Sequence, residues 1–251
     1  MLSETEDYIV VNKPAPLLVH PSVPDNPPTL LDGIKDLLAY DIANGAKLSI
    51  INRLDRETSG VVIVAKNKAT ARQFGIAMQE HKITKEYLAL AHGAPKENKF
   101  TVKAPILRAG EVEKSKIWVK QIPHPDGKPS ITKFELIEEL KSFSLLKVRP
   151  ETGRMHQIRV HSLHVNLPIV GDKIYGVNGN CYLEFIKNGW TKELESELIL
   201  PRQAVTLSPN VAGRSWKMGS SNAKLIQNLW SRPLTAGIRP PKISIASRTK
   251  E

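Results

Sequence analysis

The stretch INRLDRETSGVVIVA, residues 51–65, joins a polar loop to an uninterrupted apolar run. Residues 61–65 are rich in β-branched side chains, and a continuous apolar run of this length is typical of a strand buried on both faces. The preceding residues, 51–60, carry Asp55 close to Arg53 and Arg56. A loop delivered by a rigid strand is a common place for catalytic residues. The sequence therefore predicts a buried strand with a functional loop in front of it.

Apolar periodicity on either side of this strand predicts an α+β fold. Strands are expected at 7–11, 86–92, 100–106, 116–122, 131–137 and 143–149. Helices are expected from a cap at Thr29 to about residue 38, and at 68–81, 155–166 and 181–196. Asp126-Gly127 predicts a turn between two strands. We therefore expect a mixed, mostly antiparallel sheet with flanking helices and loops.

Composition favours a polyanionic partner. The 251 residues carry a net charge of +11, which is typical of proteins that bind nucleic acid or an anionic membrane surface. The single cysteine, Cys181, cannot form an intrachain disulfide, which fits a reducing compartment. The acidic N-terminus is unlike a signal peptide, and no apolar stretch is long enough to cross a membrane. We expect a cytoplasmic monomer that does not enter membranes.

Asp55 is the first candidate for chemistry. The neighbouring Arg53 and Arg56 favour its charged form, and an ionised carboxylate can act as a nucleophile or as a base. The alternative is a structural loop, in which Asp55 forms a salt bridge while Thr58 and Ser59 bond to turn amides.

A second candidate is the segment PETGRMHQIRVH, residues 150–161. A Thr-Gly-Arg turn leads into the predicted helix, and a helix N-terminus suits phosphate. Arg154, His156, Gln157 and Arg159 cannot all point into a core, so Ile158 is expected to be the inward residue. The alternative is a solvated basic helix face.

Two further patterns carry less chemical information. Small residues flank Asp172 and Tyr175 in residues 168–176, which a structural turn also explains. His156, His161 and His164 invite a metal site, but they lack the spacing and the intervening Glu of a metallohydrolase helix. With no Gly-rich phosphate loop either, no metal and no cofactor are expected.

These segments, in this order, resemble the RluA family of RNA pseudouridine synthases over about residues 7–204. The family signature His-Arg-Leu-Asp-x-x-Thr-Ser-Gly is matched except at Asn52, and its usual Asp-Lys-Pro is replaced by Asn12-Lys13-Pro14. Further segments that match family motifs are 85–87 (KEY), 153–161 (GRMHQIRVH) and 168–176 (PIVGDKIYG).

The resemblance implies the pseudouridine synthase catalytic fold and a role for each matched residue. Asp55 is expected to be the essential carboxylate, Tyr87 to stack on the flipped base and take part in proton removal, and Arg159 to pair with Asp55. Arg53 is expected to help flip the uridine, while Lys13 and Arg154 are expected to contact phosphate. The residues expected to bind RNA or the target nucleotide are Arg53, Lys13, Arg154, His156, Gln157 and Thr58.

The implied reaction isomerises uridine in rRNA or tRNA to pseudouridine. It breaks the N-glycosidic bond, turns the uracil and forms a carbon–carbon bond to the same sugar, so it needs no redox partner. Three roles stay open for Asp55: attack on the anomeric carbon, support of a glycal-forming elimination, or addition to carbon 6 of the base. A uridine in a loop or single strand is the expected target, because flipping it costs less there.

The resemblance has two departures. Many relatives carry a small RNA-binding domain ahead of the catalytic domain, and this chain begins almost at the first motif. The match also ends at Ala204, after which residues 205–251 contain eight Lys or Arg and one acidic residue. We therefore expect a catalytic domain at 1–204 and an atypical tail at 205–251. The tail is either a basic RNA-binding extension or the product of an altered reading frame, in which case a C-terminal strand is missing and a sheet edge is unpaired.

Two other functions remain open from the sequence. One is a non-catalytic RNA-binding protein that keeps the fold, and the other is a metal-dependent hydrolase built on the histidines.

Overall fold

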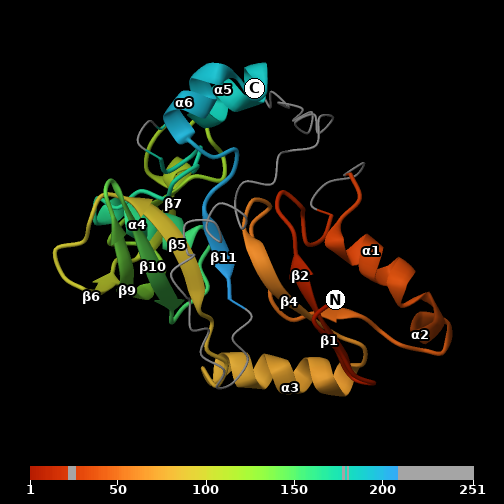
Figure 1. Cartoon of the computed structure of the whole chain (residues 1–251). Coiled ribbons are helices and arrows are strands. Elements are labelled where there is room, and N and C mark those ends of the chain that lie inside the picture. The colour runs from red at the N-terminus through yellow and green to blue at the C-terminus, as the bar shows by residue number, and fades with distance from the viewer. Residues whose placement is uncertain (22–26, 177–178, 180, 209–251) are drawn as a thin grey trace, which may run out of the picture.

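A single large sheet organises the chain (Figure 1). The computed structural model describes residues 1–21, 27–176, 179 and 181–208. The strand order is β1-β2-β4-β11-β5-β10-β9-β6, and β3 pairs with β4. Every pair in this sheet is antiparallel except β11 with β4, so the mixed, mostly antiparallel α+β fold is confirmed. The strands are β1 (Ser3–Glu4), β2 (Tyr8–Lys13), β3 (Ser49–Ile50), β4 (Ser59–Ala65), β5 (Tyr87–His92), β6 (Lys99–Lys103), β9 (Ile131–Leu140), β10 (Phe143–Pro150) and β11 (Val205–Leu207).

Helices surround this sheet, and β7 (Ile106–Arg108) and β8 (Gln121–Pro123) form a separate pair. Figure 1 shows α1 and α2 beside the N-terminal strands, α3 across one end of the sheet, and α5 and α6 at the opposite end. Thr29 caps the first helix in a capping box with Asp32, and Asn67 caps the third. The helices are α1 (Leu30–Leu37), α2 (Ala39–Ala43), α3 (Lys68–Gln79), α4 (Gln157–His164), α5 (Cys181–Asn188) and α6 (Lys192–Leu198), with a 3₁₀ turn at Ala109–Glu111. In the part of the chain that the structure describes, no helix is long and apolar enough to span a membrane.

Two predicted elements differ from the observed ones for local reasons. In place of the strand expected at 116–122, the structure has only the short strand β8. The Ser115 hydroxyl bonds to both the N–H and the carbonyl of Ile117, so these backbone groups are not available for pairing with a neighbouring strand. The expected helix at 181–196 divides into α5 and α6 at Gly189, whose φ of 74° ends the first helix, and Thr191 caps the second. The turn predicted at Asp126-Gly127 is present between β8 and β9.

The apolar core has two main parts. One contains β2, β4 and α1, and the other contains β5, β10 and α4. Tyr87, the first residue of β5, packs against both parts. The run at 61–65 is buried in β4 as expected, except that Ile63 is half-buried. Tyr87 therefore lies where the two halves of the molecule meet.

The short strand β11 joins these two halves. Leu207 is in register with Gly60 of β4 on one side and with Tyr87 of β5 on the other. This register brings the end of the loop at 51–60, which we call the Asp55 loop, next to the start of β5. β11 lies within the segment that the sequence assigned to the tail, so the sheet extends at least to Leu207. The remaining tail, residues 209–251, lies outside the described residues.

We expect Gly60→Ala to destabilise the protein by about 2–4 kcal/mol. Gly60 has a φ of 118°, and a Cβ there would meet the backbone of Leu207, so both the backbone conformation and the β4–β11 contact resist a side chain. Urea unfolding followed by circular dichroism measures the change. Gly33→Ala in α1 is the matched control, because no atom lies within 4 Å of its added Cβ. There we expect a gain of about 0.5–1 kcal/mol, and equal effects at both positions would show that the β4–β11 contact leaves room for a side chain.

Candidate active site

A pocket of about 520 Å³ opens where the Asp55 loop, the start of β5 and the segment before α4 meet. Asp55 is its only acidic lining residue among the residues described, whereas five lining side chains are Lys or Arg. A concave site with a basic wall and one carboxylate suits a polyanionic ligand on which the carboxylate acts. The basic lining residues are Arg53, Arg56, Lys85, Arg154 and Arg159.

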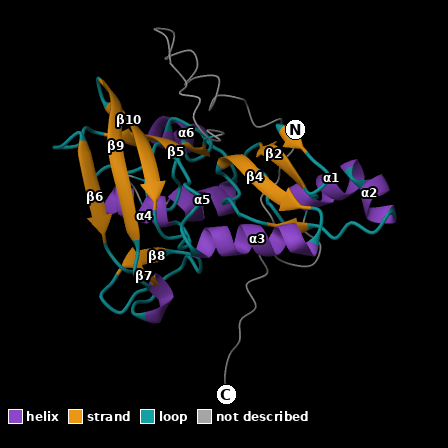
Figure 2. Cartoon of the chain, turned by 90° about the horizontal axis from the view of Figure 1, so that it is seen from below, coloured by secondary structure: helices purple, strands orange, loops and turns teal. Residues whose placement is uncertain are grey.

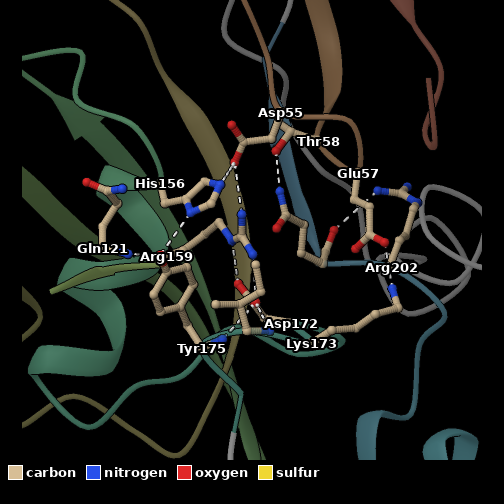
Figure 3. A network of polar contacts seen from close by, with 12 residues as sticks. Asp55, Glu57, Thr58, Gln121, His156, Arg159, Asp172, Lys173, Tyr175 and Arg202 are labelled. Atoms are coloured by element: carbon tan, nitrogen blue, oxygen red, sulfur yellow. Dashed lines mark hydrogen bonds and ion pairs between the residues drawn. The ribbon is translucent and has the colours of Figure 1, made fainter. Parts of the chain in front are cut away.

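A chain of charged contacts holds Asp55 in this pocket (Figure 3). Arg159 Nη1 donates to Asp55 Oδ2 at 3.1 Å, while Arg159 Nε and Nη2 donate to the two carboxylate oxygens of Asp172 at 2.6 and 2.9 Å. Asp172 Oδ1 also accepts the backbone N–H groups of Ile174 and Tyr175. Arg159 and Asp172 are buried, whereas the Asp55 side chain is 34% exposed. One guanidinium thus links the partly exposed carboxylate to a fixed, buried one.

The electrostatics of this chain keep Arg159 and Asp172 charged. Burial alone would lower the pKa of Arg159, but the charge and hydrogen bonds of Asp172, with a further contribution from Asp55, raise it. Burial would raise the pKa of Asp172, but Arg159 and the two backbone N–H groups hold it below its ordinary value. A permanent positive charge therefore lies 3.1 Å from Asp55 Oδ2. This is the pairing that the resemblance implied.

Helix α4 does not present a solvated basic face, so that alternative is wrong. Gln157, Arg159, His161 and Ser162 are buried together with Ile158. Polar side chains are tolerated there because most have partners in the protein. His161, for example, bonds to Thr132 Oγ1 through one ring nitrogen and to the carbonyl of Ala104 through the other. Since both nitrogens are occupied, His161 is unavailable to a metal, and the described residues contain no group of three metal-binding side chains.

Gln157 lines the pocket but supports its wall, which corrects its expected role in RNA binding. Its Oε1 accepts hydrogen bonds from the Thr152 hydroxyl and the Arg154 N–H, and its Nε2 donates to the Ile131 carbonyl and the Thr132 hydroxyl. The whole amide is satisfied within the protein. Gln157 therefore fixes the 152–154 turn relative to β9.

Lys13 is fully buried, so the expected phosphate contact is wrong. Its Nζ donates to the carbonyls of Pro14, Leu17 and Arg56 at 3.1, 2.8 and 3.2 Å. Burial lowers the pKa of Lys13 to about 7, and the nearby Asp55 charge opposes this shift. Three carbonyl acceptors match the three N–H donors of an ammonium group. Lys13 therefore ties the Asp55 loop to the segment after β2.

The other expected site residues lie at the pocket. Tyr87 lines it, and burial followed by the Asp55 charge raises the pKa of its hydroxyl, which stays protonated at neutral pH. Thr58 is buried, and its hydroxyl accepts a hydrogen bond from Gln203, so it anchors the Asp55 loop. Arg53 and Arg154 are exposed at the rim, and Arg154 Nε also donates to the Pro129 carbonyl.

Some site contacts could not be read from the sequence. Asn52, the departure from the signature, donates to the Val61 carbonyl and accepts the Ile63 N–H, so its side chain extends the pairing of β4. Lys173, in the matched segment 168–176, forms a 2.6 Å ion pair with Glu57 and also donates to the Pro201 carbonyl. In the sequence, Glu57 is visible only as one charged residue of the Asp55 loop. Its ion pair with Lys173 could not be predicted, because the two residues are distant in sequence.

Comparisons with known proteins agree with the motifs. A family model described as RNA pseudouridylate synthase matches residues 7–164, which is more than half of the chain. Among curated relatives, ribosomal large subunit pseudouridine synthase D of Haemophilus ducreyi is 38% identical over 178 residues, covering 70% of this chain and 52% of that protein. Synthase C of Buchnera aphidicola subsp. Baizongia pistaciae is 37% identical over 188 residues, covering 75% of this chain and 56% of that protein. The chain thus spans about half the length of these relatives.

Solved structures show the same fold. Human RNA pseudouridylate synthase domain containing 4 superposes with a TM-score of 0.62 at 24% identity, covering 82% of this chain and 80% of that one. Human RNA pseudouridylate synthase domain containing 1 gives 0.61 at 24% identity, covering 95% of both chains. These structures show the shared fold, and the family match with the curated relatives shows that the chain belongs to the RNA pseudouridylate synthase family, of the RluA type that its motifs indicate.

Proposed function

We propose that this chain isomerises uridine in RNA to pseudouridine, with Asp55 as the catalytic carboxylate. The observation that carries the proposal is a partly exposed Asp55 in a basic pocket, held by buried Arg159 and accompanied by Tyr87. Family membership supports the reaction class. The reaction is redox-neutral, so the proposal needs no cofactor.

Each pocket residue has a separate role in this reaction. The exposed Arg53 and Arg154 contact the RNA at the rim, where Arg53 helps the target uridine leave its stack. Tyr87 stacks on the flipped uracil. Asp55 acts on the nucleotide while the N1–C1′ bond breaks and the base turns. When the C5–C1′ bond has formed, the proton on C5 passes to water with the participation of Tyr87, and N1, which has lost its bond to the sugar, takes up a proton.

We infer that ribosomal RNA is the first substrate to test, because the relatives are named for the large ribosomal subunit. Transfer RNA is the second. We propose that the reaction takes place in the cytoplasm. We propose a monomer as the working unit. We also propose a catalytic unit of residues 1–204 together with β11, because β11 joins the two halves of the sheet.

Release of tritium from RNA labelled at carbon 5 of uracil tests the activity, since the C5–H bond is broken only if isomerisation proceeds. The full chain is assayed on total rRNA and on total tRNA. Release from one pool identifies the RNA class. If RNA binds without any release from either pool, the proposal fails and a non-catalytic RNA-binding protein takes its place.

Tyr87→Phe is expected to lower turnover about 100-fold or more, which is typical when a group that assists proton transfer is lost. The ring that stacks on the base is retained, so KM should change little. Tyr40→Phe is the matched control, because Tyr40 is 82% exposed and outside the pocket lining. Tritium release under single-turnover conditions is the measurement. Unchanged turnover would limit Tyr87 to stacking.

A further inference from the structure

His156 lies in an unusual backbone conformation that directs its ring toward Asp55. Its φ of 57° and ψ of 15° are left-handed, which few residues other than glycine adopt without cost, and it occupies the N-cap position of α4. Its Nδ1 is 2.8 Å from the Tyr175 hydroxyl, and its Nε2 is 4.0 Å from Asp55 Oδ2 (Figure 3). A strained backbone at a functional site points to a role for the side chain that it places.

The hydrogen bonds around Tyr175 determine which ring nitrogen of His156 carries the proton. The Tyr175 hydroxyl accepts the backbone N–H of Gln121 at 2.7 Å and has one proton to donate. In the described part of the chain, His156 Nδ1 is the acceptor within hydrogen-bond distance of this hydroxyl, which favours an unprotonated Nδ1 and a hydrogen on Nε2. Burial raises the pKa of Tyr175, which keeps its proton, and burial together with Arg159 lowers the pKa of His156 to about 4. The ring is therefore neutral at neutral pH.

We propose that His156 is a positioning residue, a neutral imidazole whose tautomer is set by Tyr175 and whose Nε2–H orients Asp55 through Oδ2. Arg159 Nη1 binds the same oxygen, so both donors approach one side of the carboxylate. Among the described residues, the side-chain hydrogen bonds and ion pairs of Asp55 all go to Oδ2, which leaves Oδ1 as the oxygen to react. At 4.0 Å the His156 contact is longer than a hydrogen bond. This role therefore requires the contact to shorten, by rotation of the partly exposed Asp55 side chain, when the target base enters. This inference rests on the proposed function for its consequence but not for its geometry.

Nuclear magnetic resonance tests the tautomer without any assay of activity. Long-range proton–nitrogen spectra of the ¹⁵N-labelled full chain at pH 7 distinguish Nε2–H, Nδ1–H and doubly protonated imidazole, and the signal missing in His156→Asn assigns the residue. We expect Nε2–H in the wild type and a mixture of the two neutral tautomers in Tyr175→Phe. A wild-type spectrum with Nδ1–H, or with both nitrogens protonated, would overturn the proposal.

The activity of His156→Asn tests the positioning role. Asn tolerates the left-handed backbone, so the substitution removes the ring with little added strain. We expect kcat to fall about tenfold, as for a lost hydrogen bond to a charged group, with KM unchanged. His164→Asn, an exposed position on the same helix, should leave both constants unchanged. A tenfold rise in KM, or no change in either constant, would contradict the proposal. If the wild type releases no tritium, the proposed function fails and the tautomer alone decides this inference.

Discussion

Asp55→Asn is expected to abolish tritium release, with turnover at least about 1,000-fold lower, in the range seen when a residue that performs the chemistry is removed. The amide has nearly the same shape but carries no negative charge, so it neither attacks carbon nor stabilises a developing cation. Single-turnover assays on the preferred RNA measure the loss. Residual activity within tenfold of the wild type would remove Asp55 from the chemistry.

The same substitution should leave the fold intact. Asp55 is one-third exposed and Arg159 keeps its buried partner Asp172, so we expect the free energy of unfolding to change by about 1 kcal/mol or less. Asp126→Asn, whose side chain is 85% exposed, is the matched control for the chemical change and should keep full activity. RNA binding by Asp55→Asn at wild-type affinity would separate a catalytic defect from a binding defect.

Arg159→Ala is expected to destabilise the protein by about 3–5 kcal/mol and to lower activity as well. The stability loss arises because Asp172 has no exposed surface and would lose both of its side-chain hydrogen-bond donors. Urea unfolding measures the loss. In the double variant Arg159→Ala/Asp172→Asn the buried charge is gone, and the remaining oxygen can still accept the backbone N–H groups of Ile174 and Tyr175. We expect the double variant to recover part of the stability but none of the activity.

An exposed arginine pair provides the control for this result. Arg149 donates twice to Glu86 near the surface, with distances of 2.7 and 2.9 Å similar to those in the buried pair. Solvent screens this pair, so Arg149→Ala should cost about 1 kcal/mol or less. If both arginines cost the same, the burial of Asp172 does not set the magnitude of the stability loss.

Local pattern predicted the elements that local contacts stabilise. The β-branched run at 61–65 lies in β4, the period at 68–81 is α3, and the predicted strands near 86–92, 131–137 and 143–149 are β5, β9 and β10 (Figure 2). These segments carry their own signal, because each buries the face that its apolar period defines. The segments that failed, 116–122 and 181–196, contain a side chain or a glycine that competes with regular hydrogen bonding.

The polar residues of the site were harder to interpret. The sequence predicts that Lys13 and Gln157 bind RNA. In the structure, both side chains instead form hydrogen bonds with groups of the protein itself. A charged or amide side chain looks the same in sequence whether solvent, RNA or a buried carbonyl satisfies it. Burial distinguishes these cases, and burial depends on the whole fold.

The sequence by itself determined the family, the position of Asp55 in front of a buried strand, and the candidacy of Tyr87 and Arg159, because motifs and apolar period are local properties. Only the tertiary structure decided that Arg159 bridges Asp55 to Asp172. It also decided that Leu207 of β11 lies between Gly60 of β4 and Tyr87 of β5 in the sheet. Those contacts join residues distant in the chain, and their strength comes from exclusion of water around paired charges. No local pattern encodes that exclusion, since it arises when the two halves of the sheet close on each other.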